Sequence, residues 1–255
     1  MGIAIITGAS SGLGREYLRQ LLTTEKFEAV WAIARRKKRL EELVQTYGSR
    51  VRPLPLDLTQ QEALVNLAAL LQKEQPEVAV LVNAAGFGKM GPATAIPLHV
   101  QQEMIDLNCR AAVAVTALAL PYMHRGARIL EIASSAAFSP IPGLNVYAAT
   151  KAFLLNYSKA LHYELKDRGI QVTAVCPYWV KDTEFIPIAL QASGQGKRHF
   201  LGASQAASVV SWSLKDCQKG RWVSTPGIMC SLHRFIAWLL PNKLMLFLTV
   251  WWHRI

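Results

Sequence analysis

The chain has 255 residues, of which 51% are hydrophobic and 18% are charged. This composition is typical of a globular protein with one ample core, and it excludes a disordered, collagen-like or repetitive chain. The formal net charge of +11 favours a partner that carries phosphates or other anionic groups, such as a nucleic acid, a nucleotide or an acidic lipid surface.

Short apolar segments alternate with segments of helical periodicity from residue 3 to residue 176. This alternation predicts a parallel sheet with helices on both faces, which is an α/β fold of the doubly wound, Rossmann type. The strands are expected at residues 3–7, 29–34, 51–56, 78–83, 128–133 and 170–176. The helices are expected at residues 15–22, 60–72, 100–123 and 147–168, with another beginning near residue 37.

Glycine and proline residues cluster where several of these strands end, which is where ligands bind in such sheets. From Pro177 to about Leu201 the pattern becomes irregular, as in a loop that covers a site. No interior stretch has the composition of a linker. We therefore expect one α/β domain over residues 1–225 and a C-terminal apolar appendage over residues 226–255.

The first strand is followed by TGASSGLG, a TGxxxGxG pattern. Gly8 permits a tight turn, Gly12 leaves room for a pyrophosphate to approach the backbone, and Gly14 lets the next helix pack close to the strand. Free N–H groups at the start of that helix favour an anion. Glycine-rich turns also occur for purely structural reasons, so the loop alone leaves both interpretations open.

A run of five basic residues, Arg35 to Arg39, follows the second strand. NAD-binding proteins of this architecture carry an acidic residue there for the ribose 2′-hydroxyl, whereas an arginine accommodates the 2′-phosphate of NADP. We therefore expect Arg35 and Arg36 to contact a 2′-phosphate, which makes NADP(H) the cofactor. Lys37, Lys38 and Arg39 are interpreted as the solvated face of the next helix.

Tyr147 and Lys151 stand four residues apart in NVYAATKAF, a spacing that places both on one face of a helix. Reduction of a carbonyl by hydride needs a proton donor. A neighbouring ammonium favours the phenolate of a tyrosine and so makes it a better acid/base near neutral pH. Ser134, at the end of RILEIASS, is placed to hydrogen-bond a carbonyl oxygen.

Taken together, these motifs resemble the short-chain dehydrogenase/reductase family, and the resemblance extends to about Thr183. It implies that Tyr147 is the acid/base, that Lys151 holds the nicotinamide ribose and shifts the tyrosine pKa, and that Ser134 orients the carbonyl. Asn108, in MIDLNCR, matches the family's asparagine that anchors a water-mediated proton relay to the lysine. The cofactor contacts implied, besides Tyr147 and Lys151, are Gly8, Ser10, Ser11, Gly12, Leu13, Gly14, Arg35, Arg36, Asp57, Leu58, Asn83, Ala84, Pro177, Val180 and Thr183.

Two positions depart from the family pattern. The family's NNAG reads NAAG here, so that Ala84 stands beside Asn83, and its usual PG reads PY at Pro177 and Tyr178. The first change is expected to loosen a structural hydrogen bond. The second is expected to place a bulkier ring beside the nicotinamide or the substrate, and neither change removes a catalytic group.

The cysteines, Cys109, Cys176, Cys217 and Cys230, are scattered without the spacing of metal ligands. We expect them to be reduced and packed, and we expect no metal site. The first residues read as a strand rather than as a signal peptide, so a cytoplasmic protein is favoured over an exported one.

The C-terminal segment holds two apolar runs, residues 235–240 and 244–252, and neither reaches the roughly 20 residues that span a bilayer. The side chains that resemble an interfacial anchor are Trp238, Trp251, Trp252, Lys243, His253 and Arg254. Peripheral contact with anionic lipid is one interpretation, and packing on its own subunit or on a partner copy is the other. Either favours a lipophilic carbonyl or alcohol substrate, steroid-like or fatty-acyl-like, and we expect a homo-oligomer.

The sequence thus predicts an oxidoreductase that interconverts a carbonyl and a secondary alcohol with NADP(H). A non-catalytic NADP-binding sensor of the same fold is the alternative. A sensor would be expected to have lost Tyr147 or Lys151, and both are present. A nucleic-acid-binding protein is disfavoured because no recognised module is present and a nucleotide phosphate already accounts for the basic run.

Overall fold

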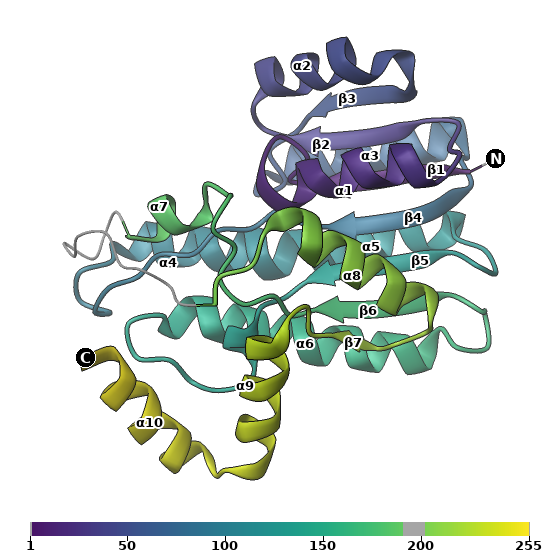
Figure 1. Ribbon diagram of the computed structural model, residues 1–255. Coiled ribbons are helices and arrows are strands. Elements are labelled where there is room, and N and C mark those ends of the chain that lie inside the picture. The colour runs from purple at the N-terminus through teal and green to yellow at the C-terminus, as the bar shows by residue number, and fades with distance from the viewer. Residues whose placement is uncertain (1, 191–201, 255) are drawn as a thin grey trace.

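The structure is a computed structural model that describes residues 2–190 and 202–254, with the side chains of the last helix described as far as Leu248. One seven-stranded parallel sheet runs through it in the order β3-β2-β1-β4-β5-β6-β7 (Figure 1). The strands are β1 (Ile3–Thr7), β2 (Val30–Ala34), β3 (Val51–Pro55), β4 (Val78–Asn83), β5 (Arg128–Ile132), β6 (Gln171–Val175) and β7 (Val223–Ser224). The order reverses between β1 and β4, which is the switch point where such sheets bind ligands.

Helices cover both faces of the sheet, so its central strands are apolar on both sides. In β1, Ala4 and Ile6 pack toward the helices α1 (Gly12–Thr24), α2 (Lys37–Tyr47) and α8 (Ala206–Gln218). The alternate residues Ile3 and Ile5 pack toward α3 (Gln61–Glu74), α5 (Ala111–Ala119) and α6 (Asn145–Glu164). The remaining helical elements are α4 (Leu98–Ile105), α7 (Phe185–Leu190), α9 (Ile228–Leu239), α10 (Asn242–Arg254), the π-turn η2 (Asp106–Arg110), and the 3₁₀ turns η1 (Gly48–Arg50), η3 (Leu120–Tyr122) and η4 (Ser135–Ala137).

Within the described residues, the continuous helical segment Leu98–Tyr122 is long and apolar enough to cross a membrane by length and composition. Its α5 portion packs against α3 and β4 and buries Ala111, Val115 and Ala119 in the core beneath the sheet. The position of α5 in that core accounts for its apolar composition.

The predicted α/β fold is confirmed. The six expected strands lie within about one residue of their predicted ends, whereas β7 and α8 were not predicted from the sequence. The strand β7 has only two residues, too few for a periodic signal. The helix α8 did carry a signal, because its buried residues recur at helical spacing: Ala206, Val209, Val210, Ser213, Leu214 and Cys217.

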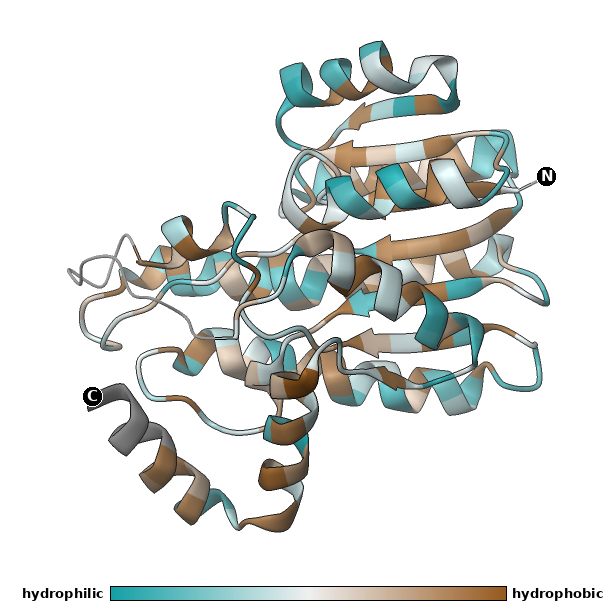
Figure 2. Ribbon diagram, viewed as in Figure 1, coloured by the Kyte–Doolittle hydropathy of each residue, from teal (hydrophilic) through white to brown (hydrophobic). Residues whose placement is uncertain are grey.

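The C-terminal helices α9 and α10 form a hairpin at the carboxyl-end edge of the sheet, drawn yellow in Figure 1. Hydropathy colouring shows α9 and the coloured first half of α10 as predominantly apolar (Figure 2). The side chains of Trp251, Trp252, His253 and Arg254 lie outside the described residues, as does the second half of the irregular loop, residues 191–201.

Candidate active site

The glycine loop joins β1 to α1 at the switch point of the sheet. Gly8 has φ +68° and Gly12 has φ +53°, in the left-handed region that favours glycine. A Cβ on Gly8 would lie 2.8 Å from the backbone of Ala84, and one on Gly14 would lie 2.4 Å from the carbonyl oxygen of Gly8. The loop is therefore drawn tightly between β4 and α1, which aims the N-terminus of α1 at the space above the strands.

Arg36 reaches back from the end of β2 to this loop. Its guanidinium donates to the Ser10 hydroxyl, with Nε at 3.2 Å and Nη2 at 3.1 Å, and to the Ser11 hydroxyl at 2.6 Å. The neighbouring Arg35 is exposed and also lines the cavity, but it makes none of these hydrogen bonds. The two arginines therefore differ: Arg36 is oriented by the loop serines, whereas Arg35 lines the cavity without these contacts.

Glu184 lies against the same basic cluster although it is far away in the sequence. Its carboxylate accepts from Arg36 Nη1 at 2.8 Å and from Arg39 Nη1 at 2.5 Å. These hydrogen bonds, the one from Arg36 first, hold the pKa of the Glu184 carboxyl below its ordinary value. Arg39 thus takes part in the site, and no local sequence signal indicated that Glu184 would join it.

Two predicted cofactor contacts turn away from the cavity and stabilise its walls. The Asp57 carboxylate accepts from the backbone N–H of Thr59 at 3.1 Å and from its hydroxyl at 2.7 Å, which fixes the turn before α3. Leu58, next to Asp57, does line the cavity. The Asn83 amide donates to Thr116 Oγ1 at 2.8 Å and to Glu131 Oε1 at 2.7 Å inside the core.

Glu131 is fully buried at the end of β5. Burial raises the pKa of its carboxyl to about 7, opposed by the hydrogen bonds from Asn83 and Thr116. One oxygen, Glu131 Oε2, has no partner among the described residues, and neither does Asn83 Oδ1. Because an uncharged carboxyl is cheaper to bury than a carboxylate, this cluster favours the protonated form of Glu131.

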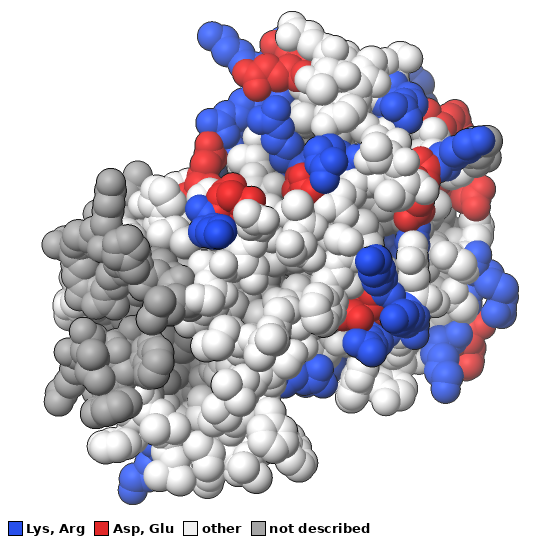
Figure 3. Space-filling model, in the orientation of Figure 1, with Lys and Arg blue, Asp and Glu red and all other residues white. Residues whose placement is uncertain are grey.

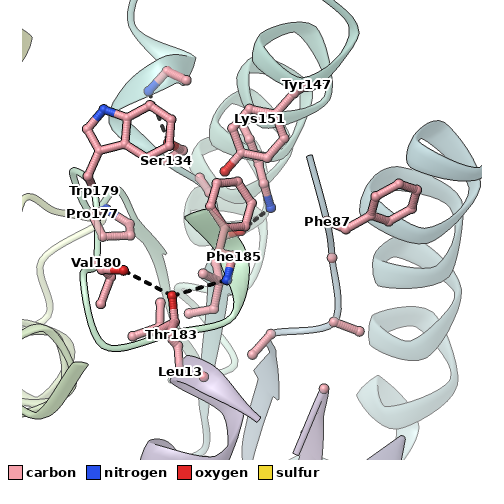
Figure 4. A pocket seen from close by; sticks show the side chains of 18 of the residues that line it. Leu13, Phe87, Ser134, Tyr147, Lys151, Pro177, Trp179, Val180, Thr183 and Phe185 are labelled. Atoms are coloured by element: carbon pink, nitrogen blue, oxygen red, sulfur yellow. Dashed lines mark hydrogen bonds between the residues drawn. The ribbon is translucent and has the colours of Figure 1, made fainter. Parts of the chain in front are cut away.

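Ser134, Tyr147 and Lys151 come together above the carboxyl end of β5 (Figure 4). Ser134 caps the turn η4, its hydroxyl accepting from the Ala136 N–H at 3.1 Å. Tyr147 and Lys151 project from the first turns of α6, and Lys151 Nζ donates to the Ile132 carbonyl at 2.7 Å. The three side chains line one cavity, so the spacing in the sequence becomes a single chemical site.

The electrostatics of the pair differ from the sequence-based expectation. Burial raises the pKa of Tyr147 to about 12, although a hydrogen bond with Ser134 opposes the shift. Burial also lowers the pKa of Lys151 to about 8. Lys151 Nζ lies 5.7 Å from the centre of the Tyr147 ring and is held by the Ile132 carbonyl. In the protein alone, desolvation thus outweighs the ammonium, and Tyr147 stays protonated at neutral pH.

Asn108 occupies the π-turn η2 and is completely buried. Its side chain is held in place by the backbone of Phe87, donating to the carbonyl at 2.9 Å and accepting from the N–H at 3.0 Å, and it also donates to Thr150 Oγ1 at 3.0 Å. A Cβ on Gly86 would lie 2.8 Å from Asn108 Oδ1 and 3.4 Å from Lys151 Nζ. Asn108 therefore borders the lysine across a glycine without lining the cavity itself.

The segment after β6 covers the catalytic side chains. Thr183 Oγ1 donates to the Val180 carbonyl at 3.0 Å and accepts from the Phe185 N–H at 3.4 Å (Figure 4). The Phe185 ring lies 5.3 Å from that of Tyr147 and 6.2 Å from that of Trp179, measured between centroids. The first half of the predicted covering loop thus contacts Tyr147 through an aromatic cluster.

A single cavity of about 1380 Å³ connects these parts. Its lining includes most of the predicted cofactor contacts: Gly8, Ser10, Ser11, Gly12, Leu13, Arg35, Arg36, Leu58, Ala84, Tyr147, Lys151, Pro177, Val180 and Thr183. Gly14, Asp57, Asn83 and Asn108 lie behind the lining. Tyr178 also lines the cavity, and so do side chains of α9 and α10 that sequence reasoning did not assign to the site: Met229, Leu232, His233, Ile236, Met245 and Leu248.

No group of three potential metal ligands occurs among His, Cys, Asp and Glu of the described residues. All four cysteines are free thiols and are buried. Burial raises the pKa of Cys109, which follows Asn108 in the sequence, to about 11.

The sequence profile of the short chain dehydrogenase family matches residues 2–189. The chain belongs to this family. It is 34% identical, over 72% of its length and 74% of the relative, to the NADP-dependent 3-hydroxy acid dehydrogenase YdfG of Escherichia coli O6:H1. The very-long-chain 3-oxoacyl-CoA reductase of Anas platyrhynchos is 33% identical over 69% of this chain and 59% of the relative. A short-chain dehydrogenase from Sphingobium yanoikuyae, solved in complex with NADPH, superposes with a TM-score of 0.77 at 26% identity and covers 89% of each chain.

Membership of the short-chain dehydrogenase family accounts for the motifs found in the sequence and for the sheet order. It also makes the chain an oxidoreductase and an enzyme. The residues that match the family's motifs lie around the cavity at the switch point, and the hairpin α9–α10 lies beyond the part matched by the family profile.

Proposed function

We propose that this enzyme interconverts a carbonyl and a secondary alcohol on a lipophilic substrate, with NADP(H) as the hydride carrier. The observation that supports it most strongly is the convergence of Ser134, Tyr147 and Lys151 in the cavity that the glycine loop and Arg36 also line. A proton donor, a hydroxyl for the carbonyl oxygen and a dinucleotide cradle thus share one space.

The residues present fit NADP(H). A Cβ on Gly12 would make only ordinary van der Waals contact, with Thr183 at 3.6 Å, so the loop is not packed tightly against its neighbours where a pyrophosphate would approach. Arg36 and Arg39 offer guanidinium groups at the end of β2, and a planar guanidinium suits a 2′-phosphate. The NADP-dependent relative and the NADPH-bound structural neighbour support the same choice.

Each catalytic side chain has a distinct task in this proposal. NADP(H) bound in the cavity would supply the hydride for the carbonyl carbon, or take it up from the alcohol carbon. In the reductive direction the Tyr147 hydroxyl gives its proton to the carbonyl oxygen as the C=O π bond breaks, and Ser134 holds that oxygen by a hydrogen bond. Lys151 holds the nicotinamide ribose, and its ammonium stabilises the phenolate left on Tyr147. Asn108 keeps the backbone beside Lys151 in place.

A lipophilic substrate, such as a fatty-acyl-like or steroid-like carbonyl, fits the walls of the cavity beyond Tyr147. There the lining is mainly apolar, with Ile141, Leu144, Trp179, Phe185 and Ile188. The name of the very-long-chain 3-oxoacyl-CoA reductase is consistent with this class, whereas the name of the 3-hydroxy acid dehydrogenase points to smaller polar substrates. We also propose that the protein is cytoplasmic, since four free buried cysteines suit a reducing compartment. We further propose that it forms a homo-oligomer and that its catalytic domain ends near residue 225.

The test is turnover of carbonyl and secondary-alcohol panels, followed by the absorbance of NADPH. Replacing Tyr147 by Phe removes the proton donor and no phosphate contact, so the rate should fall about 10²- to 10⁴-fold while NADPH binding is retained. Tyr163→Phe is the matched control because Tyr163 lies on the same helix, exposed and outside the cavity. Binding of NADPH without turnover of any panel member would favour the non-catalytic sensor instead.

A further inference from the structure

The helix α9 presents side chains to the cavity and large apolar side chains to solvent. One face turns Met229, Leu232, His233 and Ile236 toward the cavity. The other leaves large apolar side chains in solvent: Ile228, Phe235, Trp238 and Leu239, of which Trp238 is 78% exposed. Large apolar side chains are stabilised when they meet apolar surroundings, and the protein supplies these on the cavity side of α9 only.

The helix α10 repeats this arrangement. Met245 and Leu248 line the cavity, whereas Leu244 and Phe247 are exposed, Phe247 by 70%. Leu248 and the α9 residues Met229 and Leu232 line the cavity and are also exposed, by 42%, 36% and 48%. Side chains that line the cavity and are also exposed lie at its mouth. The opening beside the hairpin is therefore bordered by apolar groups.

The charge of the hairpin favours an anionic surface. From Cys217 to Ile255 the sequence contains no Asp or Glu, whereas it contains Arg234 and Lys243 within the hairpin. Figure 3 shows the surface over α9 and the described part of α10 as nearly uncharged, with basic side chains at its edge and no acidic ones in this view. Tryptophan, leucine and phenylalanine bordered by basic groups match the chemistry of a bilayer interface that carries anionic lipid.

We propose that the outer face of the α9–α10 hairpin docks on an anionic lipid bilayer and that the cavity opens into that surface, so that the substrate reaches Tyr147 from the lipid. The exposed apolar side chains and the basic charge of the hairpin support the docking, whereas the path of the substrate rests on the proposed oxidoreductase function. An amphiphilic carbonyl compound would pass its reactive group between Leu232 and Leu248 while its chain stays in apolar surroundings. Contact with water along the route would be small, which removes the cost of extracting such a molecule into solution.

The test of docking is co-sedimentation of the full chain with vesicles of phosphatidylcholine, with and without phosphatidylglycerol. The parent protein should sediment with the anionic vesicles, more strongly at low salt than at moderate salt, because salt screens the basic groups and not the apolar contact. Replacing Phe235 and Trp238 together by Ser should weaken vesicle binding about tenfold or more. Trp212→Ser, which removes an exposed tryptophan on α8, is the matched control and should change nothing.

Three results would overturn the docking: no sedimentation of the parent protein at low salt, equal binding by the double variant, or vesicle binding that Trp212→Ser weakens as much. Gel filtration of the same proteins distinguishes the alternative occupant. If the double variant had a different oligomer size from the parent, and the parent did not bind vesicles, the outer face of the hairpin would bind a second copy of the chain.

The path of the substrate is tested with two ketones, one short and water-soluble and one long-chain and carried in the vesicles. The double variant should keep the kcat/KM of the parent for the soluble ketone and lose most of it for the vesicle-borne one. Equal losses on both ketones would refute the path. If the parent bound vesicles but turned over neither these ketones nor any panel member, the oxidoreductase proposal and the path would fail while the docking would stand.

Discussion

Replacing Arg36 by Ala should weaken NADPH binding and spare NADH. The guanidinium is already oriented by the Ser10 and Ser11 hydroxyls and lies at the end of β2 where the 2′-phosphate of NADP would bind. Charge-assisted hydrogen bonds contribute about 1.5–3 kcal/mol each. The Arg36 side chain is 43% exposed, so solvent screening places the loss near the lower end, about 2 kcal/mol, or about 30-fold in Kd.

The assay is a titration of the apoenzyme with NADPH and with NADH, followed by the fluorescence of the reduced nicotinamide. Arg35→Ala is the matched control, because it removes the same charge from the neighbouring position without the hydrogen bonds to the loop. It should cost NADPH affinity much less. Equal losses of affinity for NADPH and NADH in the Arg36 variant, or a larger loss of NADPH affinity in the Arg35 variant, would refute the contact between Arg36 and the 2′-phosphate.

Two further outcomes follow from carboxylates that the structure places near the site. Glu184→Gln should strengthen NADPH binding by a few-fold, because the Glu184 carboxylate competes with a phosphate for Arg36 and Arg39. Exposed ion pairs are worth about 0.2–1 kcal/mol each. A higher Kd for NADPH in the same titration would contradict this. Glu131 has a pKa raised from 4.5 to about 7, so the folded state binds its proton more tightly than the unfolded state. The contribution of Glu131 to the free energy of unfolding is full below pH 4.5 and is lost as the pH rises through about 7. As the pH rises from 5 to 8, urea unfolding should therefore show that the parent loses stability relative to Glu131→Gln, by up to roughly 3 kcal/mol. Equal changes in the free energy of unfolding of the two proteins would contradict this.

The sequence by itself determined the parts of the protein that depend on local pattern. Runs of apolar residues such as VAVLVN became β4, and the glycines at positions 8, 12 and 14 fixed the turn into α1. The spacing of Tyr147 and Lys151 placed both on one face of α6. Steric limits on the backbone and the period of a helix act over a few residues, so they can be read without knowledge of the fold.

The tertiary structure alone decided which distant residues meet. Glu184, in the segment just before α7, lies against Arg36 and Arg39, which are about 145 residues away in the chain. Burial, which raises the pKa of Tyr147 rather than lowering it, arises from the elements packed around that side chain. The hairpin α9–α10 folds back to line the cavity, and the sequence showed only that it was apolar. Such contacts depend on how the elements pack against one another, and no local period of the sequence records that packing.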